Sequence, residues 1–316
     1  IMTSLIYALT GLVIYAGLLA FIAFHSRADT KYTGYIIGNR KVGVIGTSAS
    51  QVVSIFDGTG LVILLTLGAQ FGSGLIWGTL GIFAANILLA LQAARIRMLA
   101  SERGYVTISD MLADRIGPYA CKVSAVLIAI ALVLSLGGSL HIVGKMAAAA
   151  TGVGQTAAII TTSIVVALYM LIGGYMSVIR TDILQAAIIV FLCVFAYIYG
   201  QYPDPGAAWR AFAGMDIAQG PGLFLLLLAL NYGFIDSWQR LFSARSPAIA
   251  QKATWLTAGV NLILYSAPII LAAALIKAYP EIPPNEFIFK SLTDPDIFPA
   301  IGGAFAIALM VLVMSS

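Results

Sequence analysis

The stretch Ser54-Ile-Phe-Asp57-Gly-Thr-Gly60-Leu-Val-Ile-Leu-Leu65 sets a polar, glycine-broken patch in the middle of an apolar run that extends over residues 42–69. About 20 apolar residues cross the hydrocarbon core of a bilayer, so the patch falls near the middle of a membrane-spanning segment. A carboxylate there costs roughly 2.5 to 3.5 kcal/mol on insertion scales, and glycines are poor helix residues. The stretch predicts either a helix break that forms a binding site or a glycine kink for tight helix packing.

Composition places the chain among polytopic membrane proteins. Its residues are 60% hydrophobic and 9% charged, whereas an ordinary soluble domain carries about 25% charged residues. The net charge of +4 does not indicate nucleic-acid binding, because Lys and Arg lie in short loops between apolar runs rather than on one soluble face. The sequence has no nucleophile elbow, P-loop or HExxH motif, so we do not expect an enzyme.

Apolar runs long enough to span a membrane give the expected topology, an all-α bundle in one transmembrane domain over residues 1–316. There are nine such runs, at residues 2–24, 44–69, 72–93, 119–149, 155–173, 182–200, 222–239, 253–277 and 299–316. Cytoplasmic loops carry the excess of Lys and Arg, and an N-terminus outside puts thirteen of these residues on the cytoplasmic side and four outside. We therefore expect a multi-pass protein of the plasma membrane, or of the inner membrane in a bacterium.

Two further segments carry local predictions. In the loop at 94–118, Thr107 with Asp110 three residues on predicts the capped start of a short helix along the membrane surface. The long run at 119–149 must tilt or bend at Gly137-Gly138, and its Ser135, Ser139 and His141 are candidates to face a cavity. For His141, a packing role and a proton relay are both open.

The segment Gly173-Gly174-Tyr175-Met176-Ser177-Val178-Ile179-Arg180-Thr181-Asp182-Ile183-Leu184-Gln185 resembles the signature of the sodium:solute symporter family. Three further stretches support the resemblance in chain order: Gly38-Asn39-Arg40-Lys41-Val42-Gly43, Gln239-Arg240-Leu241-Phe242-Ser243-Ala244-Arg245-Ser246, and the pair Ser315-Ser316. Arg180 stands where many members carry tryptophan. The family includes transporters of proline, pantothenate, monocarboxylates and sugars.

The resemblance implies a LeuT-like fold, in which an extra first helix precedes two five-helix repeats of inverted topology and helix 1 of each repeat is broken. Residues 1–43 then hold the extra helix and a cytoplasmic loop, 44–200 the first repeat, and 222–316 an incomplete second repeat. On this scheme the chain stops inside helix 8, so we expect a truncated form of a longer protein.

A second break is predicted in Asn231-Tyr-Gly-Phe-Ile-Asp-Ser-Trp238, which is again polar, glycine-containing and acidic inside an apolar run. Matching breaks in two repeats point to a transport site, so we expect the residues of both breaks to bind the substrate near the midplane. These residues are Asp57, Thr59, Gly60, Tyr232, Phe234, Asp236 and Trp238. Asp236 could instead pair with Arg240 one turn on, and the aromatic side chains could instead serve packing.

The resemblance also implies a sodium site between the first break and helix 8. Its expected ligands are the carbonyl oxygens of Ile55, Gly58 and Leu312 and the hydroxyls of Ser315 and Ser316. Sodium is a hard cation that favours oxygen, and an unwound stretch supplies free carbonyls at membrane depth. The two serines could instead hydrogen-bond to carbonyls of their own helix.

The expected function is sodium-coupled symport of a small organic solute by alternating access, with Na⁺ as the coupling ion and no other cofactor. A membrane sensor domain fused to a signalling kinase is the alternative, and a kinase module beyond Ser316 would favour it. The expected partners are the solute, Na⁺ and the lipid bilayer, with no nucleic acid. The sequence does not specify the solute or the oligomeric state.

Overall fold

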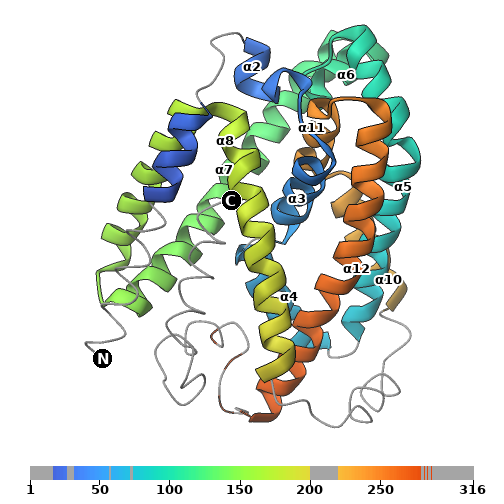
Figure 1. Cartoon of the computed structure of the whole chain (residues 1–316). Coiled ribbons are helices and arrows are strands. Elements are labelled where there is room, and N and C mark those ends of the chain that lie inside the picture. The colour runs from blue at the N-terminus through green and yellow to red at the C-terminus, as the bar shows by residue number, and fades with distance from the viewer. Residues whose placement is uncertain are drawn as a thin grey trace.

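The computed structural model describes residues 17–26, 32–56, 58–71, 74–199 and 220–278, with the single residues 281, 283 and 286. Within these ranges the chain is helical apart from turns and one isolated β-bridge. After a helical stretch at residues 17–25 come α2 (Tyr32–Ile37), η1 (Gly38–Arg40), α3 (Val44–Ile55), α4 (Gly58–Phe71), α5 (Leu75–Arg103), α6 (Ile108–Arg115), α7 (Pro118–Thr151), α8 (Gln155–Tyr199), α10 (Gly220–Tyr232), α11 (Ile235–Ser243) and α12 (Pro247–Ala278). The long helices form a bundle, and α2 and α6 lie at the same end of it (Figure 1).

Several helices are long and apolar enough to cross a membrane. In the described chain these are Leu75–Arg103, Pro118–Met146, Met170–Phe191 and Gly220–Ser243, with shorter apolar helices at Val44–Ile55 and Gln155–Leu168. Each predicted run between residues 44 and 277 overlaps helix in the described part of the chain. The first run is described only from residue 17, and the run at 299–316 lies outside the described residues.

Helix α8 covers two predicted spans, and Gly174 forms the kink between them. Its backbone has φ 57° and ψ −158°, a conformation that favours glycine because it has no Cβ. The two parts of α8 diverge as separate rods on either side of it (Figure 1). Its neighbour Gly173 also needs to be small, because a Cβ there would lie 2.4 Å from the Cβ of Ser177. The Gly-Gly pair of the family signature is therefore the corner between two spans.

Helices α10 and α12 both pack against α5. At Gly81 the contact with α10 is so close that a Cβ would lie 2.3 Å from the carbonyl oxygen of Phe224. Toward the α6 end of the bundle, α5 and α11 share a buried apolar cluster with the start of α12. Its buried members are Leu89, Ala93, Ile96, Ala100, Tyr105, Trp238, Leu241, Phe242, Ala244 and Ala250.

The predicted capped helix in the loop at 94–118 is confirmed as α6. The Asp110 backbone N–H donates to the Thr107 hydroxyl at 3.3 Å, and the Thr107 N–H donates to the Asp110 carboxylate at 2.8 Å. This reciprocal capping box satisfies two amides that the helix start leaves free. By contrast, α7 runs for 34 residues with no interruption at Gly137-Gly138, so its excess length is not taken up by a break there.

Candidate functional site

Both predicted helix breaks are present. Helix α3 ends at Ile55 and α4 begins at Gly58, and between them Phe56 leaves the helical region with φ −103° and ψ 56°. Helix α10 ends at Tyr232 and α11 begins at Ile235. A break frees backbone carbonyls and amides that a continuous helix would pair, so each interruption creates polar backbone in an apolar segment.

A cavity of about 760 Å³ lies against both breaks. Helices α3, α4, α7, α8, α10, α11 and α12 all contribute to its wall, which is mainly apolar. Its polar lining residues are Tyr35, Ser54, Ser135, Ser139, Tyr175, Asp182, Asn231, Asp236, Gln239, Arg240 and Tyr265. A largely apolar hollow with a few convergent polar groups is the usual form of a small-molecule site.

The breaks bring together part of the predicted site. Ile55, Gly60, Phe234 and Asp236 all line the cavity. Gly58 opens α4, and Thr59 lies in the first turn of that helix. The remaining predicted residues Asp57, Leu312, Ser315 and Ser316 lie outside the described residues.

Tyr232 and Trp238 lie elsewhere, against α5. The Trp238 indole is 8% exposed and belongs to the buried cluster shared with α5, and Tyr232 packs on the same cluster. The indole N–H donates to the Tyr232 carbonyl at 2.9 Å, and the Tyr232 hydroxyl donates to Gln92 of α5 at 3.2 Å. Trp238 thus satisfies a carbonyl that the second break frees, which agrees with the packing interpretation of these aromatics.

Arg240 and the carboxylates of Asp182 and Asp236 form a polar patch in the wall of the cavity. Arg240 Nε donates to the Ser50 hydroxyl at 2.6 Å and Nη2 to the Ser54 hydroxyl at 3.2 Å. Its guanidinium also pairs with Asp182 at 3.8 Å and with Asp236 at 3.5 Å. Ser50 in turn donates to Asp182. Three helices, α3, α8 and α11, are joined by this network.

The three charged groups differ in access to the cavity. The side chains of Asp182 and Arg240 are 3% and 9% exposed, whereas that of Asp236 is 32% exposed. Arg240 directs its donors to Ser50, Ser54 and Asp236, so it is already engaged by the protein. Among the described residues, Asp236 contacts Arg240 at 3.5 Å, and two carboxylates face one guanidinium. The accessible charge in the described part of the cavity is therefore negative.

Asn231 adds an acceptor at the second break. Its amide N–H₂ donates to the Leu227 carbonyl at 3.0 Å, while its side-chain oxygen is buried without a hydrogen-bond partner among the described residues. On α7, Ser135 and Ser139 line the cavity as expected, but His141 does not. The His141 Nδ1 lies 3.3 Å from Gln155 Nε2 instead.

The ion pair with Arg240 that was the alternative prediction for Asp236 is present, at 3.5 Å, but the sequence did not indicate the rest of the network around Arg240. Arg240 directly follows the apolar run at 222–239, a position typical of a loop cation, whereas the structure buries it. The available signal was that Asp182 and Arg240 each lie in or at the end of an apolar run, where an ionisable residue usually has a function or a partner. Their pairing could not be read from the sequence, because 58 positions separate them.

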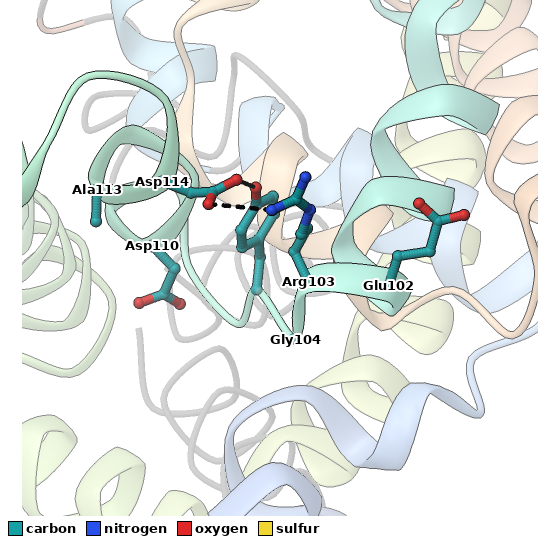
Figure 2. Close-up of a pocket in the computed structure, with 7 residues that line it drawn as sticks. Glu102, Arg103, Gly104, Asp110, Ala113 and Asp114 are labelled. Atoms are coloured by element: carbon teal, nitrogen blue, oxygen red, sulfur yellow. Dashed lines mark hydrogen bonds and ion pairs between the residues drawn. The ribbon is translucent and has the colours of Figure 1, made fainter.

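A second hollow lies where α5 turns into α6 (Figure 2). Arg103 and Asp114 point toward each other there at 3.5 Å, and the Tyr105 hydroxyl donates to Asp114 (Figure 2). This hydrogen bond, with burial and the carboxylate charge, raises the pKa of Tyr105, so the hydroxyl stays a donor at neutral pH. These contacts attach α6 to α5, so the residues that line this hollow have a structural role.

The model of the sodium:solute symporter family matches residues 35–202, which is more than half of the chain. The chain belongs to the sodium:solute symporter family. This stretch runs from α2 through both parts of α8, so it includes the first broken helix and Asp182. The family is one of transporters rather than enzymes, and the chain is accordingly an all-helical, multi-pass membrane protein.

Individual relatives agree with the family. The chain is similar to the osmoregulated proline transporter OpuE of Bacillus subtilis, with 28% identity over 59% of this chain and 40% of that protein. It is also similar to a sodium/proline symporter of Haemophilus influenzae, with 23% identity over 95% of this chain and 64% of that protein. The chain therefore spans less than two thirds of the length of both curated relatives.

A solved structure shows the same fold. A Na⁺-coupled sialic acid symporter in a substrate-bound, outward-open state superposes with a TM-score of 0.81 at 15% identity, over 98% of this chain and 70% of that chain. The prediction of a transporter fold of this family is thereby confirmed.

Proposed function

We propose that the protein is a sodium-coupled symporter of a small organic solute, which works by alternating access from a cavity between two broken helices. The observation that supports it most is the coincidence of both breaks with one 760 Å³ cavity. One sodium ion moving inward releases about 2.3 kcal/mol per 100 mV of membrane potential, and its concentration gradient adds to this. That free energy is enough for uphill transport of the solute by tenfold or more.

The solute proposed here carries an ammonium group, as an amino acid such as proline does. Among the described residues of the cavity, the accessible charge is the Asp236 carboxylate, while Arg240 is engaged by protein partners. Asn231 offers a carbonyl oxygen as a second acceptor beside the same break. The names of two relatives, a proline transporter and a sodium/proline symporter, agree with this class.

Within the predicted substrate set, Gly60, Phe234 and Asp236 are proposed to contact the solute, with Asp57 and Thr59 beside them at the first break. Tyr232 and Trp238 are proposed to hold the second break in shape from the α5 side. The overall arrangement is proposed as two inverted repeats after an extra first helix. The end of the bundle with α2 and α6 is then cytoplasmic, and the N-terminus is outside.

The sodium site is proposed as predicted, with the carbonyls of Ile55, Gly58 and Leu312 and the hydroxyls of Ser315 and Ser316. The end of α3 at Ile55 beside the cavity supports the first two ligands. In the full-length protein, Ser316→Ala should weaken sodium activation more than solute affinity at saturating sodium. Unchanged sodium dependence in both Ser315→Ala and Ser316→Ala would remove the two hydroxyls from the site.

The solute class is tested by uptake into proteoliposomes that contain the full-length protein. We expect uptake of proline or another amino acid to require sodium, and Asp236→Asn to raise the KM for that solute at least tenfold. Asp236→Glu, which keeps the charge, should retain more affinity. If monocarboxylates or neutral sugars are taken up while amino acids are not, the proposed solute class is wrong.

A further inference from the structure

A short backbone contact joins the segment before the first broken helix to the segment after the second. The Val42 N–H donates to the Ser243 carbonyl at 3.2 Å, and the Arg245 N–H donates to the Val42 carbonyl at 2.9 Å. Val42 and Ala244 thereby form a parallel β-bridge. Both are buried, at 2% and 0% exposure. We name this contact between residues 38–43 and 243–245 the clasp.

Two arginine side chains, one from α5 and one from the clasp itself, attach both sides of the clasp to α5. Arg97 Nε donates to the Ala244 carbonyl on the α11 side. Arg40 donates to the carbonyls of Ala100 and Tyr105 at 2.7 and 2.9 Å, and so holds the other side. These carbonyls lie at or just beyond the end of α5, where a helix leaves its last carbonyls unpaired. The clasp is thus anchored to the C-terminal end of α5 by charge-assisted hydrogen bonds.

The segment of the clasp that precedes α3 is held in an unfavourable backbone conformation. Gly38, Asn39 and Arg40 have φ of 59°, 52° and 56°, which is the left-handed region. An arginine rarely adopts it, because its Cβ approaches the backbone too closely. Such strain persists only where surrounding contacts impose it, and it is frequent in switch segments. Here the contacts of Arg40 with the end of α5 impose it.

The clasp connects two helices of the bundle at a distance from the breaks that border the cavity. It joins the start of α3 to the end of α11, which are the ends of these helices farthest from the breaks. The cavity is lined by Ser54 near the other end of α3 and by Asp236 in the first turn of α11. The clasp connects α3 and α11 at the α6 end of the bundle. A solute that left the cavity between these two helices toward that end would therefore have to separate them at the clasp.

We propose that the clasp is the latch of the cytoplasmic exit: its two backbone hydrogen bonds break when the cavity opens inward and re-form when it closes. The proposal rests on the proposed transport cycle and orientation. Neutral backbone groups suit this role, because water can pair with them once they separate. The latch also explains why a strained segment lies directly before the first broken helix.

One test removes a single hydrogen bond of the clasp. Arg245→Pro deletes the N–H that donates to Val42, and the preceding Ala244 already has φ −60° and ψ 144°, which suits a residue before proline. Arg245→Ala is the matched control, because it removes the exposed side chain and keeps the N–H. Both are made in a cysteine-free full-length protein with Val53→Cys as the reporter, since Val53 lines the cavity and is 2% exposed.

The readout is the rate at which a membrane-impermeant maleimide labels the reporter from the cytoplasmic face of inside-out vesicles. Loss of one hydrogen bond should raise that rate about fivefold to tenfold in Arg245→Pro and leave it unchanged in Arg245→Ala. Equal rates in the two variants would overturn the latch. The labelling requires no transport, so it remains decisive even if the proposed function fails.

A second test locks the clasp. In the full-length protein, a disulfide between Val42→Cys and Ala244→Cys should abolish uptake until a reductant is added, while solute binding from the outside persists. The control is the pair Ser109→Cys and Ser124→Cys, whose hydroxyl oxygens lie 3.0 Å apart between α6 and α7. Its disulfide should leave uptake intact. Uptake at the unlinked rate through a locked clasp would contradict the proposal.

Discussion

Asp182 and Arg240 show how a single pair of residues can determine both stability and the polarity of a site. Their side chains are almost completely buried, and they join helices far apart in the sequence. Removing one partner of a buried pair leaves an uncompensated charge, which costs far more than the pair itself contributes. Both side chains also line the cavity, so the same pair fixes the polar patch in its wall.

Arg240→Gln, which leaves the buried Asp182 carboxylate without its cation, should therefore lower the free energy of unfolding by about 3 to 5 kcal/mol. The measurement is thermal or denaturant unfolding of the full-length protein in detergent. Arg103→Gln is the control, because it breaks a pair at 3.5 Å whose side chains are 60% and 34% exposed, and should change stability by less than about 1 kcal/mol. Equal effects of the two substitutions would show that the buried network does not stabilise the fold.

At the scale of elements, the interruptions of the helices were predictable and their supports were not. Gly58, Gly60 and Gly233 beside acidic residues predict a break or a kink in the first apolar run and a break in the second. The indole that pairs with the Tyr232 carbonyl could not be assigned from sequence, because an aromatic near a break packs or binds with equal plausibility until its neighbours are known. The capping box of α6 was predictable because its contacts are local.

Trp238→Phe tests the support of the second break. It keeps an aromatic ring in the buried cluster but removes the N–H that donates to the Tyr232 carbonyl, so we expect a loss of about 1 kcal/mol in stability. The KM for the solute should change less than twofold, since the indole faces α5. A large rise in KM with unchanged stability would instead place Trp238 in the binding site.

Close packing of α5 against α10 gives a second prediction for the elements. Gly81→Ala would put a Cβ 2.3 Å from a backbone oxygen of Phe224, so α10 must shift, and we expect destabilisation of about 1 to 3 kcal/mol. Gly137→Ala on α7 is the control, because no atom lies within 4 Å of its Cβ position and alanine favours a helix by about 1 kcal/mol. Unfolding measurements should thus give effects of opposite sign. The same sign for both would show that the α5 contact is not tight.

For the whole molecule, hydrophobic periodicity predicted which stretches span the membrane, because the bilayer sets their length. It did not predict that Gly174 alone turns one span into the next, or that Val42 meets Ala244 across 202 positions. These contacts depend on how helices far apart in the sequence pack, which no local pattern encodes. Two broken helices beside a common cavity are the arrangement in which secondary transporters bind their substrates near the midplane.

The measurement that tests this account most directly is solute accumulation by the full-length protein in proteoliposomes under an inward sodium gradient. The account predicts that an amino acid such as proline accumulates above its external concentration, that accumulation collapses when an ionophore dissipates the sodium gradient, and that potassium does not replace sodium. Equilibration of the solute without accumulation, at a rate independent of sodium, would contradict it.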